Sequence, residues 1–194
     1  MVDVRVEGFE VFPQVYYVCG IGNIFCGIIN IMQNAPIPSD EEKRMKAVHS
    51  LALLDTEPEE RFDVLTREAA KKLNVSMSMV SILDSDREWY KSCVGFDKTE
   101  GGRAESFCGH ALLATNIFIV EDTLNDPRFA DNPTVIGEPY VRFYAGIALF
   151  DHKTRQPIGV FCVKDTKPKK LTTEEIGIMV DLADKAEQEL NKTK

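Results

Sequence analysis

The chain has 194 residues, 44% of them hydrophobic, and a formal net charge of −8 at pH 7. This length indicates one domain with an extension, and the hydrophobic content is typical of a globular chain with a buried core. An acidic protein repels phosphate backbones, so the charge argues against a nucleic-acid partner. The basic run at 164–170 is interrupted by an aspartate and a proline, and we interpret it as a solvated turn.

The five cysteines also limit the class of protein. Their number is odd and no C-x-x-C motif occurs, which argues against a disulfide framework and against a zinc ribbon. Cys108 and His110 supply at most two ligands, short of a four-ligand zinc site, so we expect no metal. Reduced thiols predict a cytoplasmic protein.

Residues 1–34 differ in character from the rest of the chain. The apolar run at 15–32 approaches the length of a membrane span, but it contains two asparagines and three glycines. It also lacks the positive residues that flank spanning helices and signal peptides. We expect a non-domain N-terminal extension at 1–34 rather than a membrane anchor, and one domain at 35–194.

Two helices are predicted next. Ser39 and Glu42 have the spacing of a capping box, and the first helix is expected to run to about Leu54. The run 56–59, T-E-P-E, repeats that signature before a second helix, which Asn74 is expected to end. Apolar residues at helical spacing predict the buried face of the second helix: Phe62, Leu65, Ala69 and Leu73.

A strand hairpin follows at 75–83 and 88–94, around the turn 84–86. Strict alternation in the second strand would place some side chains on each face of the sheet. One face would carry Trp89, Lys91 and Cys93, and the other Tyr90 and Ser92.

The run 105–133, E-S-F-C-G-H-A-L-L-A-T-N-I-F-I-V-E-D-T-L-N-D-P-R-F-A-D-N-P, is the most informative part of the chain. Ser106 is expected to cap a short helix at 107–114, on which Cys108 and His110 point about 200° apart. A buried strand is expected at 117–120, before an irregular segment that carries Phe129. An aromatic ring, a thiol, an imidazole and carboxylates around a short helix and a loop are what a small-molecule pocket needs.

The remaining elements are an irregular lid at 125–140, a hairpin at 141–150 and 158–165, and a final helix. A capping box at 172–175 opens that helix, which runs to about Leu190. Its apolar residues have heptad spacing, so it either lies on its own sheet or forms a dimer seam. These residues are Ile176, Met179, Ala183, Ala186 and Leu190.

Four stretches together resemble the GAF domain, the sensory module of histidine kinases, diguanylate cyclases and phosphodiesterases. They are 53–63 (L-L-D-T-E-P-E-E-R-F-D), 105–133, 142–146 (R-F-Y-A-G) and 158–165 (I-G-V-F-C-V-K-D), and the likeness runs from about 35 to 190. The resemblance implies an α/β, PAS/profilin-like fold. It has a central antiparallel sheet of about six strands, terminal helices on one face and a ligand pocket on the other.

The resemblance also implies a function and a site. The function is small-molecule sensing in signal transduction without a fused output domain, with a homodimer through the terminal helices and a signalling protein as partner. Ligand would close 125–140 and bias the terminal helices. Neither the ligand nor a cofactor is identified. Apolar contacts are expected from Trp89, Phe107 and Phe129, and polar contacts from Cys108, His110, Asp122, Arg142 and Tyr144.

Two other kinds of GAF ligand fit the residues less well. Bilin-binding GAF domains attach their chromophore through a Cys beside a His, and here Gly109 separates the two. Cyclic-nucleotide GAF domains carry an Asn-Lys pair, then Phe, then Asp-Glu. Here Asn125, Phe129 and Asp131 follow that order, but no Lys follows the Asn and no Glu follows the Asp.

Two alternatives to a sensor remain open. Free methionine-R-sulfoxide reductases are stand-alone GAF domains, and Cys93 and Cys108 lie where two of that family's cysteines would be. Cys108, in the first turn of its helix, would have a lowered pKa. The family's nucleophilic loop cysteine has no counterpart in 128–131, R-F-A-D, so we expect no enzymatic activity. The other alternative is a ligand-free dimerisation scaffold whose pocket is filled by its own side chains.

Overall fold

The computed structural model describes residues 32–192. One sheet of six strands lies at the centre, in the order β3-β2-β1-β6-β5-β4, and all of its strand pairs are antiparallel. The α/β fold expected from the sequence is therefore confirmed. The strands are β1 (Met77–Leu83), β2 (Arg87–Val94), β3 (Glu100–Gly102), β4 (Phe118–Val120), β5 (Phe143–Phe150) and β6 (Pro157–Asp165).

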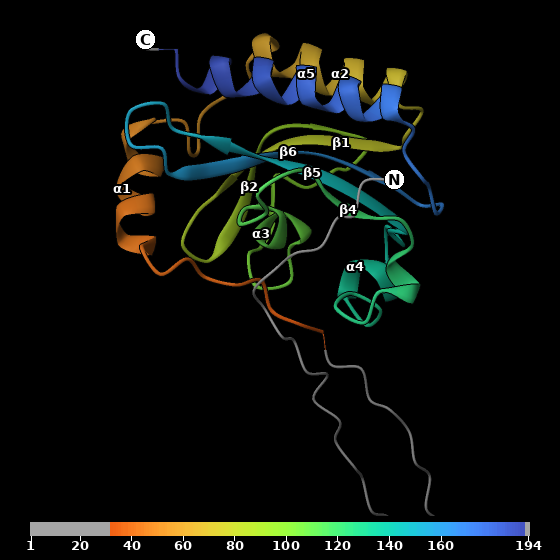
Figure 1. The fold of residues 1–194 in the computed structure, drawn as a ribbon. Helices are drawn as coiled ribbons and strands as arrows, with labels where there is room; N and C mark the ends of the chain where they lie inside the picture. Colours follow the sequence, from red (N-terminus) through yellow and green to blue (C-terminus); the bar gives the residue numbers. More distant parts are fainter. Residues whose placement is uncertain (1–31, 193–194) are drawn as a thin grey trace, which may run out of the picture.

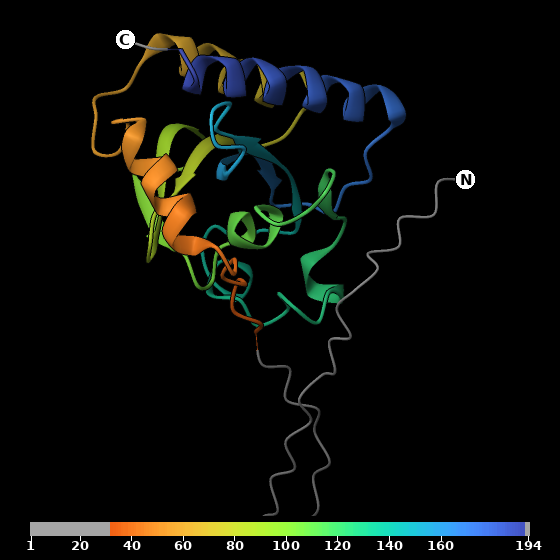
Figure 2. The same ribbon diagram turned by 60° about the vertical axis from the view of Figure 1, so that its left-hand side comes forward.

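Helices cover the sheet from both sides (Figure 1). Helices α2 (Glu60–Lys72) and α5 (Thr173–Leu190) lie side by side on one face, and α1 (Glu41–Ser50) lies at one end of the sheet (Figure 2). The other face carries three short elements: α3 (Phe107–Ala111), the 3-10 helix η1 (Thr123–Asn125) and α4 (Pro133–Ile136). None of the helices within residues 32–192 is long and apolar enough to cross a membrane.

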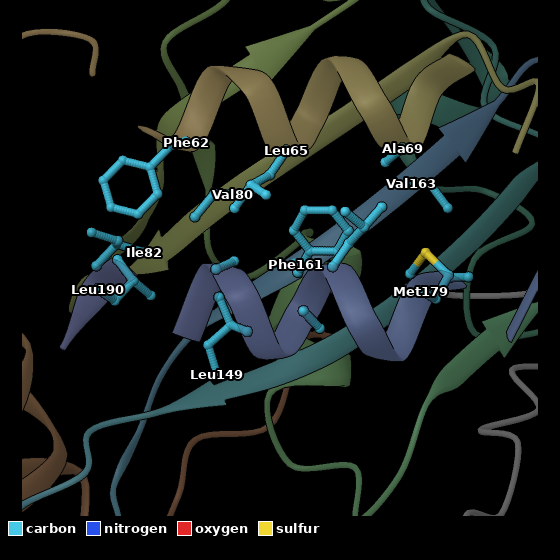
Figure 3. Packing of buried hydrophobic residues seen from close by; sticks show 14 of the residues in the cluster. Phe62, Leu65, Ala69, Val80, Ile82, Leu149, Phe161, Val163, Met179 and Leu190 are labelled. Carbon is cyan, nitrogen blue, oxygen red and sulfur yellow. The ribbon is translucent and has the colours of Figure 1, made fainter. Parts of the chain in front are cut away.

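Helix α5 packs onto its own sheet. It begins with the expected capping box, in which Thr172 and Glu175 satisfy each other's backbone N–H groups. Met179 and Leu190 are buried in one cluster with Phe161 of β6 (Figure 3), and Ala183 and Ala186 are buried there too. The heptad spacing predicted either a helix that lies on its own sheet or a dimer seam. The burial of these residues is explained by the first, contact with the sheet of the same chain.

The starts of the first two helices differ from the sequence expectation. The N-cap residues are Asp40 and Glu59, neither of which makes a side-chain capping bond, and α1 ends at Ser50 rather than near Leu54. The Thr56 hydroxyl instead accepts a hydrogen bond from the Lys91 ammonium at 2.7 Å. The Thr56 hydroxyl therefore bonds to Lys91 on β2 and does not cap the second helix, although the local sequence pattern predicts that it does.

The end of α2 is as expected. Leu73 is its C-cap, and Asn74 follows in the left-handed conformation at φ 48°. Asparagine tolerates this conformation better than most residues and is common after a helix.

A β-bulge changes the faces of β2. The register places Val80 opposite Ser92 and Ser81 opposite Tyr90, so Lys91 is an extra residue on this strand. As a result, the Ser92 hydroxyl donates to Asp63 Oδ1 on α2 at 2.6 Å. Strict alternation therefore fails after Lys91, and the expected pairing of Tyr90 and Ser92 on one face is wrong.

The first described residues, 32–35, pack on the face opposite α2 and α5. The Met32 N–H donates to Asp131 Oδ2 at 2.8 Å, and the Ala35 N–H donates to the Ala104 carbonyl at 2.7 Å. His110 Nε2 lies 3.0 Å from the Gln33 carbonyl oxygen. Residues 1–31, most of the predicted extension, lie outside the described part of the chain.

Candidate ligand cavity

A cavity of about 200 Å³ lies on the sheet face opposite α2 and α5. Its floor is Met77 and Met79 of β1, Glu88 and Tyr90 of β2, and Lys164 of β6. Its walls come from the segments 96–107 and 133–141. The volume is below the roughly 300–1,000 Å³ of pockets for drug-sized ligands, so the cavity suits a small molecule.

Strand geometry explains why these side chains meet. Successive residues of a strand point to opposite faces, so β1 directs Met79 to the cavity and Val80 to the helices. In the same way β6 directs Val163 under the helices and Lys164 into the cavity. Lys164 lies opposite Met77 on one neighbouring strand and opposite Tyr144 on the other.

Lys164 is a buried cation at the base of the cavity. Its side chain is 8% exposed, and its Nζ lies 5.9 Å from the Phe107 ring centroid and 6.0 Å from that of Tyr144. Among residues 32–192 its ammonium forms no hydrogen bond and no ion pair within 4.0 Å. Burial alone would lower the pKa of Lys164, but nearby groups, first among them the Glu88 carboxylate, outweigh it and raise the pKa well above its ordinary value. The ammonium therefore stays protonated, and the interpretation of 164–170 as a solvated turn is wrong for Lys164.

Glu88 is a buried acid in the same cavity. It is 2% exposed, and its Oε1 accepts a hydrogen bond from the Ser81 hydroxyl at 2.9 Å. Two residues along β2, Tyr90 also lines the cavity. Burial, reinforced by the Glu88 carboxylate, raises the pKa of Tyr90, so its hydroxyl remains a neutral hydrogen-bonding group.

Among the eight side chains predicted for the site, Phe107 lines the cavity. It follows Ser106, whose hydroxyl accepts from the Gly109 N–H and caps α3 as expected. Behind Phe107 lie two stacked rings, Phe129 at 4.4 Å and Tyr144 at 5.1 Å between centroids. These two rings support the cavity wall from outside it.

Cys108 and His110 form part of that supporting layer and do not line the cavity. Cys108 is fully buried, and its sulfur accepts a hydrogen bond from the Tyr144 hydroxyl at 3.2 Å. His110 packs edge-on against Phe129, with 4.9 Å between the ring centroids. Burial lowers the pKa of His110, so this imidazole is neutral at pH 7.

The other three predicted residues lie elsewhere. Trp89 is buried on the opposite face of the sheet, in the cluster beneath α2 and α5, so it cannot line the cavity. Asp122 caps η1 by accepting from the Leu124 N–H at 3.2 Å. Arg142 donates to the Val135 carbonyl of α4 at 2.8 Å and holds the segment that walls the cavity.

The buried thiols are not activated. Burial raises the pKa of Cys108 well above its ordinary value, and the neighbouring Cys162 sulfur, 3.5 Å away, adds to this effect. Burial likewise raises the pKa of Cys93 to about 11. The expectation of a lowered pKa at Cys108 is wrong, because α3 is a single short turn and its N-terminal field does not offset desolvation. Within residues 32–192 no three His, Cys, Asp or Glu side chains are grouped so that they could hold a metal ion.

Sequence reasoning missed the charged residues of the cavity. Lys164 directly follows the apolar strand 158–163. Because buried strands rarely carry a charge, this position was the signal in the sequence that Lys164 has a special role. Glu88 and Tyr90 alternate with Trp89, so placing Trp89 under the helices would have placed both in the cavity.

A central antiparallel sheet with two long helices on one face and a small cavity on the other defines an α/β domain with a cavity of small-molecule size. The GAF domain family matches residues 57–190, and the chain belongs to this family of sensory signalling domains. A cyclic di-GMP phosphodiesterase from Pseudomonas aeruginosa is 38% identical over 138 residues, which are 71% of this chain. The chain spans 23% of the length of that relative.

Solved structures agree on the fold. The GAF domain of a phosphoenolpyruvate-protein phosphotransferase from Coxiella burnetii superposes with a TM-score of 0.57 and 14% identity, covering 78% of this chain and 95% of that one. A type II free methionine-R-sulfoxide reductase from Thermoplasma acidophilum superposes with a TM-score of 0.55 and 15% identity, covering 67% of this chain and 89% of that one. At these identities the likeness concerns the fold alone.

Proposed function

We propose that this domain senses a small molecule in signal transduction and that the molecule binds in the cavity beside Lys164. The supporting observation is the buried Lys164 ammonium. Among residues 32–192 it forms no hydrogen bond and no ion pair within 4.0 Å, and it faces a cavity of about 200 Å³. A buried charge is costly unless it is paired, and an acidic group of a ligand pairs with Lys164. A scaffold whose pocket is filled by its own side chains would leave no such space.

In this proposal, ligand binding closes the segment 125–140 over the cavity. It contributes Pro133, Thr134, Glu138 and Pro139 to the cavity wall, and Phe129 from the same segment stacks on Phe107. A ligand that contacts both the floor and this wall favours the closed arrangement, and that preference shifts the population of the domain. The floor strands β1 and β6 carry α2 and α5 on their other face, so a change at the cavity reaches the terminal helices through shared strands.

The signal then passes to a partner protein or a second copy of the chain, in the cytoplasm. Free thiols at Cys93, Cys108 and Cys162 support a reducing compartment. The inward faces of the terminal helices are already used by the core. Homodimerisation therefore uses their outer surfaces, where Val64 of α2 and Val180 of α5 are exposed.

A thermal-shift screen of a library of charged metabolites tests this function. At least one compound should raise the melting temperature, because ligand that binds only the native state stabilises it. Lys164→Met should abolish the shift, while Lys46→Met, which changes an exposed lysine, should retain it. No shift in any variant, together with no bound small molecule in native mass spectrometry of freshly purified protein, would leave the scaffold interpretation standing.

A further inference from the structure

The cavity holds buried charges of both signs that attract each other but are not in direct contact. Glu88 and Lys164 both line it, and within residues 32–192 neither forms an ion pair within 4.0 Å. The Glu88 carboxylate has one hydrogen bond, from Ser81, and Lys164 Nζ has none from the described chain. Each charge therefore has room for a partner that the protein does not supply.

The other charged residues around the cavity indicate which charges the ligand carries. Glu105 and Glu138 line it together with Lys98, so carboxylates outnumber ammonium groups there. Glu100 also lines the cavity, but it is already paired with Arg87 at 2.7 Å. A ligand with only negative groups, such as a nucleotide phosphate, would meet these carboxylates at close range. The excess of carboxylates favours a ligand that carries a positive group as well as a negative one.

The apolar part of the cavity bears on the rest of the ligand. Met77, Met79, Phe107 and Val141 line it, so it accepts an apolar group as well as charges. Methionine side chains adapt to the shape of what they contact, and the Phe107 ring offers a flat surface. The volume of about 200 Å³ holds a compact molecule and excludes a dinucleotide.

We propose that the ligand is a small zwitterion with an apolar side chain, the chemistry of a free α-amino acid. Its carboxylate pairs with the Lys164 ammonium and its own ammonium with the Glu88 carboxylate, and its side chain lies among Met77, Met79 and Phe107. The two charges of the ligand remove two unpaired buried charges at once, which neither a simple acid nor a simple amine does. This inference rests on the proposed function and specifies the ligand class for it.

Isothermal titration of the full chain with L-valine, L-leucine and L-methionine tests the class. For the amino acid that binds tightest, the matched probes are the same molecule without its ammonium and without its carboxylate; for L-valine these are 3-methylbutanoate and 2-methylpropylamine. We expect each probe to bind at least about tenfold more weakly than the amino acid, because one buried charge is then left unpaired.

Two variants assign each contact. Glu88→Gln removes the partner of the ligand's ammonium, so the amino acid and its ammonium-free probe should bind this variant about equally. Lys164→Met removes the partner of the ligand's carboxylate, so the amino acid and its carboxylate-free probe should bind this variant about equally. Glu42→Gln and Lys46→Met, at an exposed ion pair on α1, should behave as wild type. Circular dichroism and melting temperature verify the fold of each variant; if one fails to fold, the wild-type comparison of probes still decides.

The outcomes separate the two proposals. Equal wild-type binding of an amino acid and its ammonium-free probe overturns the zwitterion. So does the absence of binding by all three amino acids. If the metabolite screen then finds another ligand lost in Lys164→Met, the sensor function stands without the amino-acid class. If nothing binds in either experiment, both proposals are wrong.

Discussion

The ring of Phe107 stacks on the ring of Phe129, with 4.4 Å between centroids and 23° between planes. Phe107 lines the cavity at the start of α3, whereas Phe129 belongs to the segment 125–140. This stack is one direct contact between the helix that borders the cavity and the segment proposed to close over it; His110 of the same helix also packs edge-on against Phe129.

The first prediction concerns how much this stacking contact contributes to stability. Phe107→Leu and Phe129→Leu should each lower the free energy of unfolding by about 1–2 kcal/mol, since both rings are buried. The double variant should lose less than the sum, by about 0.5–1.5 kcal/mol, because the stacking is lost only once. Urea unfolding gives all three values. Phe143→Leu, in the core under the helices, is the control and should be additive with Phe107→Leu.

A second prediction concerns stability in acid. Arg44 and Arg103, both buried, donate to the Glu41 carboxylate; burial alone would raise the pKa of Glu41, but these bonds lower it from 4.5 to about 2. The folded-state pKa is below the unfolded one, so the stabilisation is present above about pH 4.5 and is lost as pH falls towards 2. Its size is on the order of 3 kcal/mol.

Glu41→Gln should therefore destabilise the protein strongly at pH 7 and only slightly near pH 2.5. Guanidinium unfolding at a series of pH values measures the difference from wild type. The control is Glu42→Gln, the next residue, which forms an exposed pair with Lys46 and should change little at any pH. A Glu41→Gln effect that stays constant from pH 7 to 2.5 would contradict this account.

Thiol chemistry is the subject of the third prediction. Burial raises the pKa of Cys93 to about 11 and that of Cys108 well above its usual value, so both thiols are overwhelmingly protonated at pH 8. In a coupled assay with thioredoxin and NADPH, the protein should not reduce free methionine-R-sulfoxide above the no-enzyme rate. Steady turnover that Cys108→Ser abolishes would instead make the protein an enzyme.

Alkylation tests the raised pKa values of Cys93 and Cys108 without a substrate. Iodoacetamide at pH 8 should leave Cys93 and Cys108 unmodified in the folded protein, and peptide mass mapping resolves each site. In 8 M urea both should react. Rapid labelling of Cys108 in the folded state would show that its thiol is reached and ionised, contrary to its burial.

The fourth prediction concerns the start of the domain. A chain beginning at Met32 should melt within a few degrees of the full chain, because the backbone bonds of Met32 and Ala35 remain. A chain beginning at Ser39 loses these bonds, exposes His110 and should melt at least about 4 °C lower. Calorimetry of both chains checks this, and equal melting temperatures would show that residues 32–38 contribute nothing.

The fifth prediction separates the two faces of α5. If a homodimer forms through the outer surface, Val180→Glu should give a folded monomer by sedimentation, since Val180 is 42% exposed. Met179→Glu, one residue earlier, should abolish cooperative unfolding, because it places a charge inside the core. A monomeric wild type, or a dimer unchanged in Val180→Glu, counts against the proposed association.

Local patterns in the sequence were sufficient for much of this domain. The capping box at Thr172 and the stop at Asn74 depend on residues a few positions apart, so local sequence is enough to determine them. The same holds for Ser106 as the cap of α3. The family resemblance added the arrangement of six strands and the position of the cavity face.

Only the tertiary structure decided which side chains reach the cavity. The extra residue at Lys91 reverses the faces of the end of β2, and the choice of face for Trp89 depends on the helices that cover it. Lys164 is one of several lysines in its run, and it becomes a buried cation because β1 and β5 pair on both sides of it. Burial, and with it the pKa of Cys108, is set by neighbours distant in the chain, which no local spacing reveals.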